Sequence, residues 1–176
     1  MSVIVEDGTQ VANANSYLSV ADADTYHTLY GHDDWAGTDA DKGTALINAT
    51  QSIELLYGQR YLSAPENSSQ SLLFPRFTFV VNHIQLINTG TIPTQLKNAV
   101  AEVALMYLNG SDVFPTPNIA QALRSRTTTV GQISKSETYM GIPPVESFSG
   151  FNKIDLLLAP ILYVQKKGTM PTRFRL

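Results

Sequence analysis

Histidine and carboxylate side chains are the groups in this chain best suited to acid–base or metal chemistry. The three histidines are His27, His32 and His83. None of them stands four residues from another metal-ligating side chain in a recognised pattern. A lone histidine is more often a surface or core residue than a ligand or a base. We therefore expect neither a catalytic nor a metal-binding role for these three residues.

A group of aspartates follows the second histidine, and it resembles a cation-binding loop only at first sight. An EF-hand loop needs oxygen ligands at fixed spacing and a bidentate glutamate at its end, and this pattern is absent. Helix capping and solvation explain the aspartates better. They are Asp33, Asp34, Asp39 and Asp41.

Catalysis by the remaining polar residues has little support. Glu54 and Glu102 are conceivable general acids, but each falls on a predicted helix, where a solvated face is the usual position. The chain has neither a glycine-rich phosphate loop nor a Gly-x-Ser-x-Gly elbow. The absence of cysteine excludes thiolate nucleophiles and cysteine-ligated metals. The sequence therefore predicts a protein that is not an enzyme and needs no cofactor or metal.

The composition fits one domain with a core. The chain has 176 residues, of which 43% are hydrophobic and only 15% charged. Charge is unevenly spread: residues 1–60 hold nine acids and two bases, and residues 61–176 hold six acids and ten bases. We expect an oriented molecule with an acidic and a basic part, although acids at helix starts explain the pattern equally well. Neither a signal peptide nor a membrane span is predicted.

Two helices are predicted near the N-terminus, after a short apolar strand or arm at residues 3–5. Ser19 and Asp22 form the start signal of the first helix, and Gly31 its stop. The pattern Thr38 to Asp41 repeats the start signal for a longer helix that runs to about Tyr61. The only tryptophan, Trp35, falls in the polar loop between them.

The middle of the chain mixes loops with the clearest helix. Phe74-Pro75-Arg76 is predicted to pack a loop against the helices. Residues 79–81 favour a short strand and residues 83–88 a helical turn. Pro93, taken as the first helical residue, opens a helix that ends at Gly110 and whose apolar stripe suits the centre of a bundle.

The last third of the chain has two unusual segments. Residues 111–150 contain a Thr- and Ser-rich stretch at 126–139 that favours β-structure, with residues 145–148 as a possible pairing partner. An insertion of this length is more often functional than neutral. A final helix is predicted from about Phe151 to Leu158. After it comes a basic tail with apolar side chains, at Lys166, Lys167, Met170, Arg173, Phe174, Arg175 and Leu176.

These patterns predict a mainly α fold, a small bundle of three to four helices. The helical body takes in about 16–110 and 151–164. An extended β-hairpin or arm spans about 111–150, and an extended C-terminal tail spans 165–176. The whole chain, 1–176, forms one domain.

Six blocks of sequence, in order along nearly the whole chain, resemble a family of tailed-phage proteins. Residues 15–26 are similar to its opening helix motif, and Phe74-Pro75-Arg76 stands where the family usually has Trp-Pro-Arg. The other blocks are residues 45–50, Ile92-Pro93 with the helix that follows, 131–137 and 154–160. The family carries two labels: DnaT-like single-stranded-DNA-binding protein, and head–tail connector or neck adaptor of the head-completion type.

The connector label implies a structural virion protein of the neck, between capsid and tail, assembled in the host cytoplasm. It implies a ring, usually of twelve copies, that docks under the portal protein, extends the DNA channel and offers an attachment surface to the tail. Genomic double-stranded DNA would pass through the lumen without specific binding, and no membrane is involved. The tail residues named above become a portal-docking arm. The insertion becomes an inter-subunit arm, with Arg126, Thr128, Val130, Ile133, Lys135 and Tyr139 as its contact residues.

Two other interpretations remain open. A single-stranded-DNA-binding accessory protein would use the basic tail with aromatic side chains for stacking, but the whole chain is acidic and has no dense basic face. Phe74 in place of tryptophan, and Arg60 alone where arginines often follow the second helix, weaken this interpretation further. An enzyme such as a wall-degrading neck protein would need a carboxylate pair in a cleft.

Overall fold

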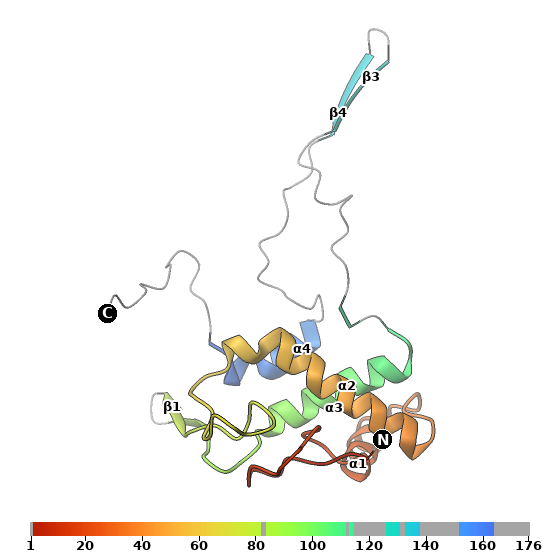
Figure 1. Cartoon of the computed structure of the whole chain (residues 1–176). Helices are drawn as coiled ribbons and strands as arrows, with labels where there is room; N and C mark the ends of the chain where they lie inside the picture. Colours follow the sequence, from red (N-terminus) through yellow and green to blue (C-terminus); the bar gives the residue numbers. More distant parts are fainter. Residues whose placement is uncertain are drawn as a thin grey trace, which may run out of the picture.

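The computed structural model describes residues 2–81, 84–111, 113–114, 126–130, 133–137 and 152–163. Within these ranges it contains four α-helices and two separate two-stranded antiparallel sheets (Figure 1). The predicted class, a mainly α body with a β-hairpin, is confirmed.

Helix α1, Val20–Tyr30, begins and ends as its sequence signals predict. The Ser19 hydroxyl accepts a hydrogen bond from the backbone N–H of Asp22 at 3.1 Å. Gly31 closes the helix with φ of 66°, a left-handed conformation that glycine adopts without steric cost. Local capping chemistry alone therefore sets both ends of α1.

Helix α2, Asp39–Tyr57, starts with the predicted capping box between Thr38 and Asp41. It passes into a 3₁₀ turn, η1 at Gly58–Arg60, so the α-helix ends four residues before the predicted Tyr61. Gly43 has a packing reason to be small, because a Cβ there would lie 3.0 Å from a methyl group of Val3. The N-terminal segment can therefore lie directly against α2.

Helix α3, Thr94–Leu108, is the central element of the body. Pro93 occupies its N-cap position and not the predicted first helical position. Leu96, Val100 and Val103 are fully or almost fully buried, as the apolar stripe predicts. α3 packs against α1, α2 and α4, Asn152–Leu158, which continues into the 3₁₀ turn η3 at Ala159–Ile161.

The first sheet corrects one expectation. β1, Phe79–Val81, is the predicted strand, but residues 84–87 form β2, Ile84–Ile87, in place of the predicted helical turn. The two strands pair antiparallel with an irregularity after Phe79. A four-residue apolar run does not distinguish helix from strand by itself, and pairing with β1 decides the outcome.

The second sheet lies entirely within the Thr- and Ser-rich stretch. β3, Arg126–Val130, pairs antiparallel with β4, Ile133–Glu137, across Gly131 and Gln132. The predicted hairpin is present, and β4 is the strand that pairs with β3. Residues 145–148, the expected pairing partner, lie outside the described residues. The prediction treated residues 126–139 as one side of the hairpin, although a glycine between two β-prone runs, here Gly131, is a hairpin signal in the sequence.

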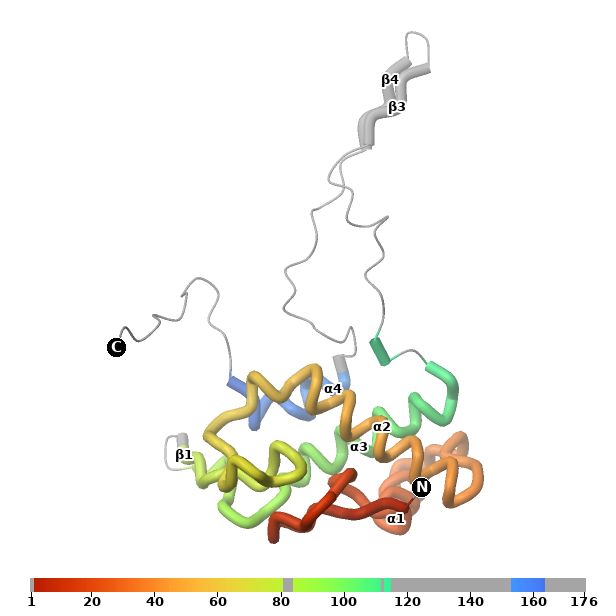
Figure 2. Tube along the Cα trace, in the orientation of Figure 1, coloured from red at the N-terminus to blue at the C-terminus, as the bar shows by residue number. Residues whose placement is uncertain are grey.

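The N-terminal segment, predicted as a short strand or arm, forms no regular strand at residues 3–5 and lies along the body (Figure 2). Val5 forms an isolated bridge with Ser16. The buried carboxylate of Glu6 accepts hydrogen bonds from three backbone N–H groups, at Gly8, Gln10 and Val11, each at 2.9 Å. These three hydrogen bonds, and not strand pairing, hold the turn at residues 6–11 in place.

Candidate functional site

The predicted arm residues fall on the β3–β4 hairpin. Arg126, Thr128 and Val130 lie on β3, directly opposite Glu137, Lys135 and Ile133 on β4. Five of the six predicted arm residues are therefore register partners of one another or of Glu137 in this hairpin. Tyr139 and the predicted tail, residues 165–176, lie outside the described residues.

Charge also separates the body from the remaining segments of the chain. Residues 2–81, 84–111 and 152–163 hold twelve acidic and five basic side chains, which gives a net charge of −7. The rest of the chain holds three acidic and seven basic side chains, a net charge of +4. The basic groups therefore concentrate in the insertion and tail.

Most basic side chains of the body are already engaged. Lys42 pairs with Asp24 at 2.7 Å, and Lys153 pairs with Glu102 at 2.7 Å. Arg76 is buried, with 5% of its surface exposed. Among the described residues of the body this leaves Arg60 and Lys97, which is too few for an electrostatic footprint on a phosphate backbone.

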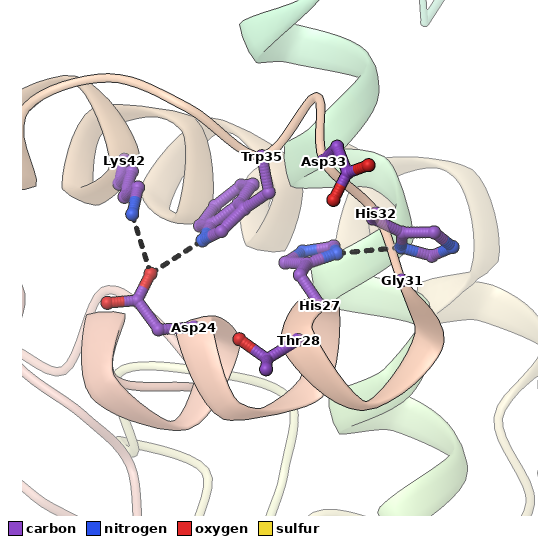
Figure 3. Close-up of a pocket in the computed structure, with 8 residues that line it drawn as sticks. All are labelled: Asp24, His27, Thr28, Gly31, His32, Asp33, Trp35 and Lys42. Carbon is purple, nitrogen blue, oxygen red and sulfur yellow. Dashed lines mark hydrogen bonds and ion pairs between the residues drawn. The ribbon is translucent and has the colours of Figure 1, made fainter.

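The first polar cluster of the body surrounds a pocket of about 300 Å³ between α1 and the loop that follows it (Figure 3). His27 and His32 face each other with their Nδ1 atoms 2.9 Å apart. Trp35 stacks on His27, with ring centroids 4.2 Å apart, and its indole N–H donates to Asp24 at 2.7 Å. Lys42 donates to the same Asp24 oxygen. These contacts hold the loop after α1 against the helix.

The short contact between the Nδ1 atoms of His27 and His32 restricts which of the two rings carries a proton there. One ring must donate and the other accept at 2.9 Å, so the two Nδ1 atoms share one proton. Burial of His27, reinforced by the nearby His32, lowers the pKa of His27 to about 4. For Asp24, burial acts to raise the pKa, but hydrogen bonds from Lys42 and Trp35 bring it below its ordinary value. Near neutral pH the His27 ring is therefore neutral and the Asp24 carboxyl is ionised.

A second polar cluster lies around Arg76, where the predicted packing of Phe74-Pro75-Arg76 is confirmed. The Arg76 guanidinium donates to the carbonyl oxygens of Leu62, at 2.9 Å, Leu73, at 3.1 Å, and Ser63. It also lies over the rings of Phe74 and Tyr61. Burial lowers the pKa of Arg76, but an arginine side chain stays charged in proteins.

Glu54 belongs to the same cluster. Its carboxylate accepts hydrogen bonds from the Tyr17 hydroxyl and from the backbone N–H of Leu73, the latter at 2.6 Å. Burial raises the pKa of Glu54, while the hydrogen bonds from Tyr17 and Leu73 act in the opposite direction. The expected solvated face is wrong for Glu54, because the Leu73 loop folds over it.

Glu102 corrects the same expectation on α3. It is buried, accepts a hydrogen bond from Tyr26 at 2.7 Å and pairs with Lys153. Since α3 is covered by α1 and α4, a carboxylate in its middle must find partners on both. The two glutamates considered as general acids are thus tied into the packing of the body.

The sequence analysis did not pair His27 with His32, because their spacing of five residues matches no recognised ligand pattern. The available signal was Gly31: a left-handed turn there folds the next residue back over the last helical turn.

The aspartates behave as expected, since Asp39 and Asp41 lie in the first turn of α2, and Asp33 and Asp34 are exposed. His83 lies outside the described residues. The described part of the chain contains no group of three or more potential metal ligands. Its helices include none long and apolar enough to cross a bilayer.

Comparison with known proteins identifies the family. A protein-family model described as "Putative DnaT-like ssDNA binding protein" matches residues 1–175, and the chain belongs to this family. Neither a curated protein nor a solved structure matches the chain. The family description agrees better with the single-stranded-DNA-binding interpretation than with the connector interpretation.

Proposed function

We propose that this protein is a structural head-to-tail connector whose copies form a ring, of about twelve subunits, under a phage portal. The observation that carries the proposal is the β3–β4 hairpin, a two-stranded sheet with no third strand among the described residues. A two-stranded hairpin alone is marginally stable in water. Such a hairpin gains most from a partner surface, which a neighbouring subunit provides in a ring.

Charge supports the same assignment. A body of net charge −7 and segments of net charge +4 are complementary between neighbours, so the basic segments of one copy can contact the acidic body of the next. The acidic body also suits the wall of a DNA channel, because like charge keeps the passing genome from binding.

In this role the chain acts without catalysis, cofactor or metal. Its partners are further copies of itself, the portal protein, and tail or further neck proteins, in the neck of the virion. The tail, residues 165–176, docks on the portal. The neighbouring subunit is contacted by the insertion residues Arg126, Thr128, Val130, Ile133, Lys135 and Tyr139.

A single-stranded-DNA-binding accessory protein is the second candidate, and the family description favours it. The body gives such binding little support, because Lys42 and Lys153 are paired and Arg76 is buried. Binding would therefore depend on the bases of the insertion and tail. It would weaken steeply with salt, as phosphate contacts do.

One experiment separates the two candidates. The purified chain is mixed with isolated portal rings, and separately with a labelled single-stranded oligonucleotide, and both mixtures are followed by sedimentation and electron microscopy. We expect a ring on the portal and weak oligonucleotide binding. A chain that ignores the portal but binds the oligonucleotide with nanomolar affinity establishes the second candidate instead.

Two variants locate the contacts. Deletion of residues 165–176 is expected to leave the fold intact and abolish portal docking. The matched control, Lys97→Glu, adds negative charge to the body outside both proposed arms and is expected to dock normally. If the deletion unfolds the protein, the tail belongs to the core and its assignment as an arm is wrong.

A further inference from the structure

The C-terminal end of α3 leads into Asn109-Gly110, the only Asn-Gly dipeptide of the chain. Asparagine before glycine is prone to spontaneous deamidation, because glycine has no side chain to shield its backbone nitrogen or to restrict the backbone around it. Both residues are exposed, so water reaches them. This dipeptide is therefore the position of the chain best suited to chemical modification without an enzyme.

The modification needs only water as a co-reactant. The backbone nitrogen of Gly110 loses its proton and attacks Cγ of Asn109, which forms the N–Cγ bond of a succinimide ring. The Cγ–Nδ2 bond breaks, and Nδ2 leaves as ammonia with the proton that Gly110 gave up. Water then breaks one of the two bonds between the ring nitrogen and a carbonyl carbon. Its hydroxide stays on the carbon and its proton returns to the nitrogen, which gives aspartate or isoaspartate.

The fold holds the two reacting atoms apart. Asn109 has ψ of 8°, which turns the Gly110 nitrogen away from the Asn109 side chain, whereas ring closure needs both on the same side of the Cα–C bond. The Gly110 N–H donates to the Tyr107 carbonyl at 3.1 Å, and the Ser111 N–H donates to the Met106 carbonyl at 2.9 Å. These hydrogen bonds cap α3, so the cap must open before Gly110 can attack.

A second constraint comes from the loop that follows α1. The Nδ2 atom of Asn109 donates to the Asp34 carboxylate at 2.6 Å, across 75 residues of sequence. Nδ2 is the leaving group of the reaction, and the attacked Cγ is held in place with it. A hydrogen bond to a charged group is stronger than one between neutral groups. Asp34 therefore restrains the reactive side chain and, by the same bond, ties its own loop to α3.

We propose that Asn109 is a deamidation site gated by the α3 cap and by Asp34, and that its conversion releases the loop after α1 from α3. Conversion replaces the donor Nδ2 with a carboxylate oxygen, so two carboxylates face each other where a donor faced an acceptor. Isoaspartate disturbs the contact further, because it inserts the side-chain Cβ into the main chain at the helix end. The modification depends on neither a ring nor DNA, so its outcome is separate from that of the connector function.

Deamidation rates test the gate. The folded protein and the protein unfolded in guanidinium chloride are incubated at the same mildly alkaline pH, and conversion of each asparagine is followed by peptide mass spectrometry. We expect Asn109 to react at least about tenfold more slowly in the folded protein, because the cap opens only part of the time. Equal rates in the two states overturn the gate.

A glycine variant assigns the reaction to this dipeptide. Gly110→Ala is compared with the parent in the unfolded chain alone, because φ of 66° at Gly110 strains any other residue in the folded protein. We expect slower conversion of Asn109 in the variant. An unchanged rate would show that Gly110 does not supply the attacking nitrogen.

The role of Asp34 has its own pair of variants. Asp34→Ala is expected to raise the folded-state rate at Asn109 about fivefold, the effect of losing one exposed hydrogen bond to a charged group. Its rate in the unfolded chain should stay unchanged. The matched control, Asp33→Ala, removes the neighbouring exposed aspartate and should leave both rates as they are. A folded-state rate that ignores Asp34→Ala overturns this part of the proposal.

Exchanging the two groups tests the consequence of conversion. Asn109→Asp mimics one product and should lower the melting temperature by about 3 °C. The double variant Asn109→Asp with Asp34→Asn again sets an amide against a carboxylate. It should recover about half of the loss, the rest being due to a negative charge at the C-terminal end of a helix. A double variant no more stable than Asn109→Asp would contradict repulsion between residues 34 and 109 as the cause.

Discussion

The two ends of α2 are stabilised by different kinds of polar group. Beyond its C-terminal end, the Arg76 guanidinium binds three backbone carbonyls and keeps its charge at any pH that proteins meet. Before its N-terminal end, His27 shares a proton with His32 and stacks on Trp35. The first end is fixed by a permanent charge and the second by titratable groups. We therefore expect the first end to resist acid and the second to yield to it.

Removal of Arg76 should produce the largest effect. Arg76→Ala leaves three carbonyls without their donor and the Phe74 and Tyr61 rings without a covering group, so we expect a loss of about 3–5 kcal/mol of unfolding free energy. Denaturant unfolding measures it, with Lys97→Ala as a control that should stay within about 0.5 kcal/mol. A loss below about 1 kcal/mol would show that the guanidinium is dispensable at this end.

Acid should affect the His27 end. The folded-state pKa of His27, about 4, lies below its ordinary value of about 6.5. As the pH falls, His27 is therefore protonated in the unfolded chain before it is protonated in the folded one. The unfolding free energy should therefore fall as the pH drops from about 7 to 4, by about 2–3 kcal/mol from this residue, with no further loss below pH 4.

His27→Phe isolates this contribution, since phenylalanine fills the space without titrating. The variant should show a flatter pH dependence than the parent between pH 7 and 4, followed by denaturant unfolding with Trp35 fluorescence. The raised pKa of Glu54 acts in the opposite sense, with stability lost as pH rises, but it is common to both proteins and cancels in the difference. Equal slopes for the two proteins would rule out His27 as the source.

A smaller effect is expected from Tyr17→Phe at the Arg76 end. The Tyr17 hydroxyl donates to Glu54 and accepts from the backbone N–H of Phe74 at 3.0 Å. Its loss leaves a buried donor and a buried acceptor with fewer partners, worth about 2 kcal/mol. Tyr163→Phe, an exposed tyrosine, is the matched control. The difference between the two variants in denaturant midpoint measures the buried hydroxyl.

The smallest effect concerns the helix start at the His27 end. Thr38→Ala removes the side chain that caps α2 and should cost about 1 kcal/mol. Thr38→Ser keeps the hydroxyl and should restore most of that loss. Thermal unfolding followed by circular dichroism compares the three proteins, and a serine variant as weak as the alanine variant would exclude capping as the cause.

The sequence predicted those parts of the fold that local chemistry decides. Ser19, Gly31 and Thr38 act within a few residues of themselves, and the helix ends they predict are confirmed. β2 was missed because its strand character depends on pairing with β1. The pairing of β3 with β4 inside residues 126–137 was also missed, because the β-prone pattern alone does not divide that stretch into two strands.

The polar clusters were harder to predict, since the residues that hydrogen-bond to one another in them are distant in sequence. The carbonyls that Arg76 binds and the Tyr17 hydroxyl that reaches Glu54 are assembled by the loop over α2, which no periodicity indicates. For the arms, the sequence located the hairpin region, and its proposed role remains a prediction for the portal experiment.

The β3–β4 hairpin has one further consequence, for handling the isolated protein. Each of its strands has an outer edge that is unpaired among the described residues, and such edges promote edge-to-edge aggregation. Arg126, Lys135 and Glu137 are the kind of charged residue that protects exposed edges. Replacing them with threonine should therefore lower the solubility of the free subunit, even where its helical body stays folded.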